Sequence, residues 1–178
     1  MSETQRALIR ERDELQRKAM IDGPARLWNR AAIPEVLGGE VARAKRSTPL
    51  CIAMIDADHF KTVNDNHGNK VGDAVLVELP VRMPRLAREF DAASRNGGEE
   101  IAAVLSNCSL DPAQVVAERL LSSVAEVPVA TPVGPPAVTV SIGFAAYGPA
   151  HADVRHTIGA VDASLYRSRA NGRNRVEI

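Results

Sequence analysis

Several features that would point directly to a function are absent from this sequence. Its 178 residues carry 22 basic and 22 acidic side chains, so no overall positive field would attract nucleic acid or an anionic membrane. The first twenty residues are highly charged and lack the apolar core of a signal peptide. The longest uncharged stretch, 127–150, contains five prolines, which a membrane helix does not easily tolerate. We therefore expect a cytoplasmic chain that neither binds nucleic acid nor inserts this segment into a membrane.

Cysteine and histidine are too few and too scattered for a disulfide framework or a zinc site. Cys51 and Cys108 are the only cysteines, and the four histidines lack zinc-ligand spacing. Cys51 lies in an apolar run, which predicts a buried structural thiol and fits a reducing compartment. The sequence has no P-loop, dinucleotide fingerprint or Gly-x-Ser-x-Gly elbow. A calcium loop starting at Asp56 fails at Phe60 and Lys61, where a ligand and a glycine are required.

What the chain does contain is typical of one globular domain with a short appendage. Hydrophobic residues make up 45% and charged residues 25%, and a chain of this length folds without a metal or disulfide. Residues 1–21 are predicted to form a charged linker or stalk helix, and residues 22–178 the domain. Two interpretations of the helix stay open: a solvated connector, or a stalk that pairs with a second copy and joins the domain to a sensor.

The order of hydrophobic patterns predicts an α+β sandwich, in which helices cover a central, mostly antiparallel sheet. The wholly apolar run 49–55 is typical of a buried central strand. Residues 138–144 alternate between apolar and small polar or glycine residues, as a strand does. Pro80 and Pro84 interrupt one predicted helix, where an interior proline costs ~3 kcal/mol or kinks the helix. We expect helices over 30–46, 59–66, 72–88, 112–125 and 153–170, and further strands over 91–96, 100–105 and 175–178.

Two aspartates, Asp56 and Asp58, follow the apolar strand and are predicted to point toward one face. Neighbouring carboxylates repel each other unless one stays protonated or a cation compensates them. Magnesium typically binds one or two carboxylates together with substrate phosphates. Asp56 is the better candidate ligand, because Asp58 could instead cap the following helix. Position alone leaves the metal site and the helix cap as alternatives.

A second cluster, Arg95-Asn96-Gly97-Gly98-Glu99-Glu100, lies between two predicted strands. The Gly-Gly pair predicts a tight hairpin whose central residues need positive φ, and glycines let a backbone approach a phosphate closely. If this turn meets Asp56, that carboxylate with Glu99 or Glu100 forms a two-metal site for phosphoryl transfer. The alternative is a surface hairpin with solvated charges.

Taken together, these segments resemble the GGDEF family of diguanylate cyclases. The similarity covers roughly residue 22 to the C-terminus, and the motifs follow one another in the family's order and spacing. The resemblance implies a nucleotidyl-cyclase, palm-like fold that condenses two GTP into cyclic di-GMP and releases two pyrophosphates. The matching segments are Asp56-Ala57-Asp58-His59-Phe60-Lys61-Thr62-Val63-Asn64-Asp65, Gly72-Asp73, Gly97-Gly98-Glu99-Glu100, Leu165-Tyr166 and Asn171-Gly172-Arg173-Asn174.

The resemblance also implies a site that depends on Mg²⁺ or Mn²⁺, and a role for individual residues. Glu99 is the candidate for activating the attacking 3′-hydroxyl, and Asn64 and Asp73 match the residues that read the guanine edge. The implied catalytic residues are Glu99, Glu100 and Lys61, and the implied metal ligands are Asp56, the Ala57 carbonyl, Glu99 and Glu100. The implied substrate contacts are Phe60, Lys61, Asn64, Asp73, Gly97, Arg169 and Arg173.

One GTP per monomer requires two half-sites, so the resemblance implies a homodimer controlled by an upstream sensor domain. Arg88 and Asp91 form an Arg-x-x-Asp pattern with five residues between Asp91 and Gly97, where many family members carry an inhibitory site for cyclic di-GMP. The pattern recurs at 10–13, so only this spacing singles out the later copy. Arginine can pair with a phosphate or stack on a purine, and aspartate can accept from guanine. The alternative is a solvated helix end and turn.

The sequence also departs from the family's pattern, and the departures keep other hypotheses open. The second hypothesis is a catalytically weak or inactive module that binds cyclic di-GMP or GTP and regulates a partner. A third, a purely structural interaction domain, leaves the aligned carboxylates unexplained. The family's N-terminal motif survives only as Asp22, Leu27, Asn29 and Arg30, Asn69 follows Gly68 in place of histidine, Ile101 replaces an aromatic residue, and Arg169 replaces the usual lysine.

Overall fold

The structure is a computed structural model that describes residues 5, 21–22, 27–28, 33–86, 92–126, 128–131, 134, 136–148 and 153–178. The predicted inhibitory pair Arg88 and Asp91, most of the altered N-terminal motif (residues 23–26 and 29–30) and most of the predicted linker helix lie outside the described residues. Within the described part, no helix is both long enough and apolar enough to cross a bilayer.

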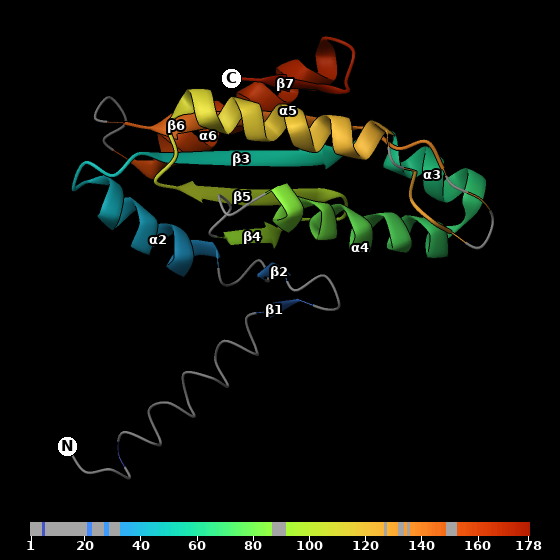
Figure 1. The fold of residues 1–178 in the computed structure, drawn as a ribbon, viewed down its shortest axis with the longest axis horizontal. Helices are drawn as coiled ribbons and strands as arrows, with labels where there is room; N and C mark the ends of the chain where they lie inside the picture. The colour runs from blue at the N-terminus through green and yellow to red at the C-terminus, as the bar shows by residue number, and fades with distance from the viewer. Residues whose placement is uncertain are drawn as a thin grey trace.

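A seven-stranded sheet forms the centre of the domain, with β3 between β5 and β6 (Figure 1). Its order is β1-β2-β4-β5-β3-β6-β7; β2 with β4 and β6 with β7 are parallel pairs, and the other described pairs are antiparallel. This arrangement confirms the predicted α+β class. The strands are β1 (Ile21–Asp22), β2 (Leu27–Trp28), β3 (Leu50–Ala57), β4 (Ala92–Arg95), β5 (Glu100–Ser106), β6 (Val140–Tyr147) and β7 (Arg175–Glu177). The helices are α2 (Ile33–Ala44), α3 (Phe60–His67), α4 (Asn69–Leu86), α5 (Leu110–Glu126) and α6 (Val154–Ala170).

Alternate residues of β3 enter two hydrophobic cores, one on each face of the sheet. Cys51 and Ile55 pack with apolar residues of α4 and α5, whereas Ile52 and Met54 pack with residues of α2 and α6. Every residue of β3 is buried, as its wholly apolar run predicts. Burial, together with the neighbouring Cys108, raises the pKa of the Cys51 thiol to about 12, so this thiol is the inert structural cysteine expected.

Helix α4 continues through Pro80 and Pro84, where the sequence predicted a strong cost or a kink. Pro80 is fully buried, and burial of its ring offsets part of the cost of the missing backbone hydrogen bond. Arg82 is also buried and donates to the carbonyl oxygens of Ser123 (3.0 Å) and Val124 (3.5 Å) near the end of α5. Burial of Pro80 and the hydrogen bonds of Arg82 to α5 therefore stabilise α4 in this region.

Strand register brings the conspicuous carboxylates of the sequence to one end of the sheet. Asp56 of β3 stands opposite Glu100 of β5 and opposite Ser141 of β6. The Ala57 N–H donates to the Glu99 carbonyl over 3.4 Å, which joins the end of β3 to the β4–β5 turn. The two acidic clusters, 43 positions apart in the sequence, are thus neighbours in the fold.

Candidate active site

An open pocket of about 360 Å³ lies at the C-terminal end of β3. Its walls come from the end of β3, the first turn of α3, the β4–β5 turn, and the end of α6 with the loop that follows. All its lining residues except His59 and Gly98 were predicted site residues. The lining residues are Asp56, Ala57, His59, Phe60, Lys61, Gly98, Glu99, Glu100, Arg169 and Arg173.

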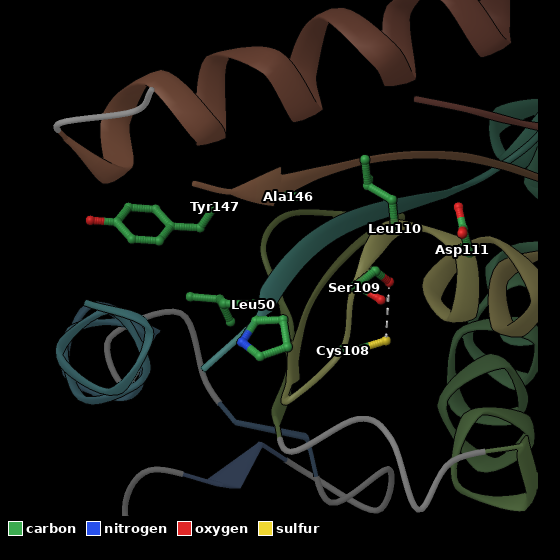
Figure 2. Close-up of a pocket in the computed structure, with 8 residues that line it drawn as sticks. Leu50, Cys108, Ser109, Leu110, Asp111, Ala146 and Tyr147 are labelled. Carbon is green, nitrogen blue, oxygen red and sulfur yellow. Dashed lines mark hydrogen bonds between the residues drawn. The ribbon is translucent and has the colours of Figure 1, made fainter. Parts of the chain in front are cut away.

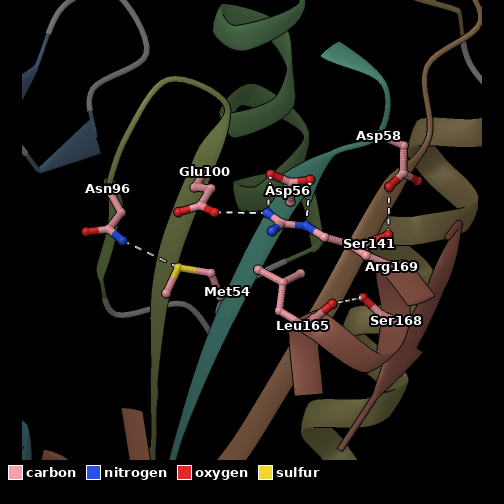
Figure 3. A network of polar contacts seen from close by, with 9 residues as sticks. All are labelled: Met54, Asp56, Asp58, Asn96, Glu100, Ser141, Leu165, Ser168 and Arg169. Carbon is pink, nitrogen blue, oxygen red and sulfur yellow. Dashed lines mark hydrogen bonds and ion pairs between the residues drawn. The ribbon is translucent and has the colours of Figure 1, made fainter. Parts of the chain in front are cut away.

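Arg169, in the last turn of α6, bridges two of the carboxylates (Figure 3). Its Nη2 lies 2.6 Å from Asp56 Oδ1 and 2.9 Å from Glu100 Oε1, and its Nε donates to Asp56 Oδ2 over 3.1 Å. The Asp56 side chain is 11% exposed, whereas those of Arg169 and Glu100 are each about one third exposed. The guanidinium therefore compensates, from the solvent side, a carboxylate that the sheet buries.

Arg169 compensates the negative charge of the Asp56 carboxylate only in part. Burial raises the pKa of Asp56 above its ordinary value; hydrogen bonding and charge from Arg169 oppose this effect, and the charges of Glu99 and Glu100 add to it. The net direction is upward, so ionised Asp56 lies in an environment short of positive charge. Such a site favours a further cation.

The oxygen atoms on this wall fit a hard divalent ion. Asp56, Glu99, Glu100 and the Ala57 carbonyl offer only oxygen donors, the type that Mg²⁺ and Mn²⁺ prefer. Among the residues that the structure describes, no group of three or more His, Cys, Asp or Glu side chains is already arranged to hold a metal. A ligand set of one or two carboxylates, a carbonyl and substrate phosphates does not require such a group.

The β4–β5 turn, residues 96–99, differs from the tight hairpin expected. Neither Gly97 nor Gly98 has positive φ, because the chain reverses over four residues and no residue there needs the left-handed region. Arg95 braces the turn by donating to the Gly98 carbonyl from Nη2 (2.8 Å) and Nε (3.1 Å). Both glycines are exposed, with no atom near where a Cβ would lie, so the turn leaves room beside the pocket. Gly98 lines the pocket, whereas the predicted contact Gly97 does not.

Two further cationic side chains line the pocket besides Arg169. Lys61 is the second residue of α3, and the N-cap of that helix, His59, has a left-handed backbone (φ 54°). Arg173 lies in the loop between α6 and β7 and also has positive φ (61°). Both side chains belong to exposed residues. Three cations facing three carboxylates suit a polyanion that binds together with metal ions.

Asn64 and Asp73 do not line this pocket: Asn64 lies further along α3, and Asp73 lies on the next helix, α4. Asn64 is one helical turn beyond Phe60 on α3, and Asp73 follows Gly72 on α4. The Asn64 Oδ1 is buried and makes no hydrogen bond. A Cβ at Gly72 would collide with the Asn64 amide and come within 2.9 Å of the Phe60 ring, so a larger residue here would displace these side chains. The buried acceptor lacks a donor of the kind that a guanine edge supplies.

Asp58 is neither part of the pocket wall nor the cap of α3. The residue at the start of α3 is His59, which makes no side-chain cap hydrogen bond. The Asp58 carboxylate is buried and instead accepts hydrogen bonds from Ser141 Oγ (2.6 Å), Thr139 Oγ1 (2.7 Å) and the Asn174 N–H (3.0 Å). Figure 3 shows Asp56 and Asp58 turned to separate partners, so the two aspartates do not form one pair.

A second pocket, of about 320 Å³, lies near the opposite end of β3 (Figure 2). Leu50, Leu110, Ala146 and Tyr147 give it a largely apolar lining, and Asp111 is the charged residue among those described around it. A pocket with one carboxylate and no lysine or arginine does not suit a phosphate-bearing ligand. The pocket near Asp56 is therefore the candidate active site.

Comparison with known proteins identifies the family of this chain. The family described as "Diguanylate cyclase, GGDEF domain" matches residues 19–175. Diguanylate cyclase DgcP of Pseudomonas aeruginosa is 34% identical over 179 residues, which cover 100% of this chain and 26% of that protein. Diguanylate cyclase A of Treponema denticola is 38% identical over 134 residues, 75% of this chain and 36% of its own length. This chain thus spans well under half of these relatives.

A solved structure shows the same fold. The GGDEF domain of DgcB from Caulobacter crescentus, crystallised in complex with c-di-GMP, matches with a TM-score of 0.82 and 32% identity, covering 89% of this chain and 95% of that one. The match with the family over nearly the whole chain, together with this likeness, settles the assignment. The chain belongs to the GGDEF domain family of diguanylate cyclases.

Proposed function

We propose that this domain is an active diguanylate cyclase that condenses two GTP into cyclic di-GMP and releases two pyrophosphates. The observation that carries the proposal is the single pocket in which Asp56, Glu99 and Glu100 face Lys61, Arg169 and Arg173. Carboxylates that bind divalent ions and cations that bind phosphates are the two requirements of phosphoryl transfer. A module that bound neither GTP nor metal ions would have no need to keep both.

The cations of the pocket have a defined task in this reaction. Lys61, Arg169 and Arg173 hold the triphosphate and stabilise the negative charge that builds up on the departing pyrophosphate. Arginine at position 169 retains the positive charge of the family's usual lysine and adds a planar fork that can bind two oxygens. Its contacts with Asp56 and Glu100 keep the guanidinium at the carboxylate wall, within the same pocket.

The carboxylates hold metal ions and receive a proton. Asp56, Glu99, Glu100 and the Ala57 carbonyl would bind Mg²⁺ or Mn²⁺, which neutralises phosphate charge and acidifies the attacking 3′-hydroxyl. Glu99 accepts the proton of that hydroxyl. The exposed glycines at 97 and 98 let the turn approach the phosphates without a side-chain collision.

Recognition of guanine falls to the second part of the site. The unpaired Asn64 Oδ1 accepts from the guanine edge, and Asp73 accepts from N1–H and N2–H₂ of the same base. A buried polar atom left unpaired is costly, so a base with the wrong pattern of donors is rejected. GTP is therefore preferred to ATP.

The reaction needs two such domains, because each monomer holds one GTP. We propose a homodimer in which the two pockets face each other, oriented by the N-terminal segment and a sensor domain upstream of it. The chain spans only 26% to 43% of the length of the first curated relatives, which leaves room for such a domain in a protein of their kind. The solved diguanylate cyclase SiaD, 32% identical with a TM-score of 0.87 over 97% of this chain and 66% of its own, is bound to its activator SiaC.

The direct test is to incubate the protein with GTP and Mg²⁺ and to measure cyclic di-GMP. Wild type should form the product, and Glu99→Ala should lower the rate at least a hundredfold, since general-base catalysis contributes about that much. Asp111→Asn, which alters the carboxylate of the apolar pocket, is the matched control and should retain the wild-type rate. Absence of product at protein concentrations that enforce dimers would rule out the enzyme.

The competing function is a binding module without turnover. It is favoured by the altered N-terminal motif and by Asn69 in place of the family's histidine. Titration calorimetry separates the two, because tight binding of GTP or cyclic di-GMP without release of pyrophosphate would support the module. The proposed inhibitory site at Arg88 and Asp91 belongs to either function, since it binds cyclic di-GMP rather than GTP.

A further inference from the structure

Asp58 is a buried carboxylate to which the proposed mechanism gives no task. It is 4% exposed, and its three donors come from two parts of the chain. Thr139 and Ser141 lie just before and within β6, and Asn174 lies in the loop between α6 and β7. The Asp58 N–H also donates to the Thr139 carbonyl over 2.9 Å. Asp58 is therefore fixed to the sheet on one side and holds a loop on the other.

The loop that Asp58 holds has an unfavourable backbone conformation. Gly172, Arg173 and Asn174 follow one another with φ angles of 111°, 61° and 46°. Glycine adopts such angles freely, but arginine and asparagine adopt them at a cost that surrounding contacts must offset. The Arg173 N–H donates to the Ser168 carbonyl over 2.9 Å, and the next N–H, that of Asn174, donates to Asp58. These two bonds hold the left-handed pair in place.

The orientation of this loop determines where Arg173 lies. Arg173 lines the pocket from the loop, and no hydrogen bond or ion pair of its side chain to a carboxylate is found among the described contacts. A long, exposed side chain of this kind depends on its backbone for its position, because none of the contacts found among the described residues restrains it. An anchor at the adjacent Asn174 therefore controls the position of the cation.

We infer that Asp58 is a positioning residue, which holds the α6–β7 loop so that Arg173 meets the triphosphate of the substrate. The inference rests on the proposed function for the role of Arg173. It assigns the two aspartates after β3 to separate tasks: Asp56 to the metal and Asp58 to the loop that carries a phosphate ligand. A charge-assisted bond to a backbone N–H is stronger than a neutral one, which suits a carboxylate for holding a strained loop.

The test is a double-mutant cycle on binding of a non-hydrolysable GTP analogue with Mg²⁺, measured by calorimetry. Asp58→Asn should weaken binding by about tenfold, because a weaker bond to the Asn174 N–H lowers the fraction of molecules whose loop holds Arg173 in the binding position. In the Arg173→Ala background, the same substitution should have little further effect, because Asp58 acts through Arg173. Glu40→Gln is the matched control, since Glu40 is a buried carboxylate that accepts from Ser106, at the other end of β5, and should leave binding unchanged.

Each outcome decides the inference. Equal losses from Asp58→Asn in both backgrounds, or wild-type affinity in Asp58→Asn, would overturn it. If Arg173→Ala binds as wild type, the inference also fails, while cyclic di-GMP formation by the wild type would still support the cyclase. Should Asp58→Asn not fold, Asp58→Glu keeps the charge but displaces the carboxylate, and the same coupling to Arg173 is expected from it. If the inference is right, the Asn174 N–H should also exchange its hydrogen faster in Asp58→Asn and in Asp58→Glu than in wild type.

Discussion

At the scale of single residues, the site combines groups that disfavour folding with groups that compensate them. Asp56 is buried beside Glu99 and Glu100, and its raised pKa shows that Arg169 does not fully offset the burial. The Asn64 Oδ1 is buried without a partner. Both features cost stability in the free protein, and both supply what a metal-bound nucleotide would use. They are typical of a binding site rather than of a core.

Asp56→Asn should stabilise the metal-free protein at neutral pH and abolish cyclase activity. The folded-state pKa of Asp56 lies above its ordinary value of 3.8, so ionisation of this carboxyl opposes folding. The stabilising effect should vanish below that ordinary value and grow as pH rises through the folded-state pKa. We expect a rise in Tm of about 2–4 °C at pH 7, the shift caused by roughly 1 kcal/mol in a domain of this size.

Thermal unfolding in EDTA measures this effect. The exposed Asp162 on α6 provides the control, and Asp162→Asn should leave Tm unchanged. Addition of Mg²⁺ should raise the Tm of wild type but not that of Asp56→Asn. A lower Tm for Asp56→Asn at neutral pH would show that the ion pair with Arg169 outweighs the burial.

Asn64→Ala should raise the KM for GTP about tenfold, because a buried hydrogen bond to the base is lost. The KM for ATP should change little, so discrimination between the two nucleotides falls. Asn66, an exposed residue on the same helix, provides the control variant Asn66→Ala. Initial rates with GTP and with ATP give the two KM values. An unchanged preference for GTP would mean that guanine is recognised by other residues.

At the scale of elements, the site depends on close packing of helices against each other and against the sheet. Gly72 lets α4 approach Asn64 and Phe60 of α3, and Gly143 lets α6 approach β6. A Cβ at Gly143 would lie 2.7 Å from the Val161 carbonyl oxygen and would collide with the Leu165 N. Backbone atoms cannot move aside as flexible side chains can. Since α6 carries Arg169, this contact also places a residue of the site.

Gly143→Ala should destabilise the domain by about 1–3 kcal/mol or more, because an added methyl group overpacks the β6–α6 contact. Gly159→Ala, on α6 but with open space around its Cβ position, should instead stabilise by about 0.4–1 kcal/mol. Urea unfolding followed by circular dichroism compares the two. Equal stability of Gly143→Ala and wild type would mean that α6 can shift away from the sheet.

At the scale of the whole molecule, the two ends of the sheet are chemically different. The end at Asp56 gathers carboxylates, cations and glycines around an open pocket, whereas the end at Leu50 carries a mainly apolar pocket. A reaction between two substrates held on two domains therefore requires the Asp56 ends to meet. On the proposed function, a contact that holds two domains with these ends apart would inhibit the reaction.

Arg88→Ala should weaken cyclic di-GMP binding by tenfold or more and remove product inhibition, because the proposed Arg-x-x-Asp site would hold two domains apart through the bound product. Binding of GTP should stay as in wild type. Arg10→Ala, in the chain's other Arg-x-x-Asp, is the control for the motif itself. Calorimetry with both nucleotides and progress curves of product formation supply the measurements. Equal cyclic di-GMP affinity in Arg88→Ala and wild type would end this proposal without affecting the cyclase assignment.

Much of the fold and of the site could be predicted from the sequence, because patterns among neighbouring residues determine it. The apolar run before Asp56 determines a central strand, and amphipathic stretches determine the helices on its faces. The order and spacing of short motifs indicated the family and named most of the residues that line the pocket. These properties depend on neighbouring residues along the chain, so no tertiary contact was needed to find them.

Other features were decided only by tertiary structure, since they arise between segments far apart in the sequence. Arg169 bridges Asp56 and Glu100 because strand register and the packing of α6 bring the three together. Helix α4 continues past Pro80, where the proline ring is buried and Arg82 bonds to α5. Asp58 looked like a helix cap or a second metal ligand until its donors on β6 and the α6–β7 loop were known. Local propensity cannot specify such partners, because their energies depend on which surfaces the fold brings into contact.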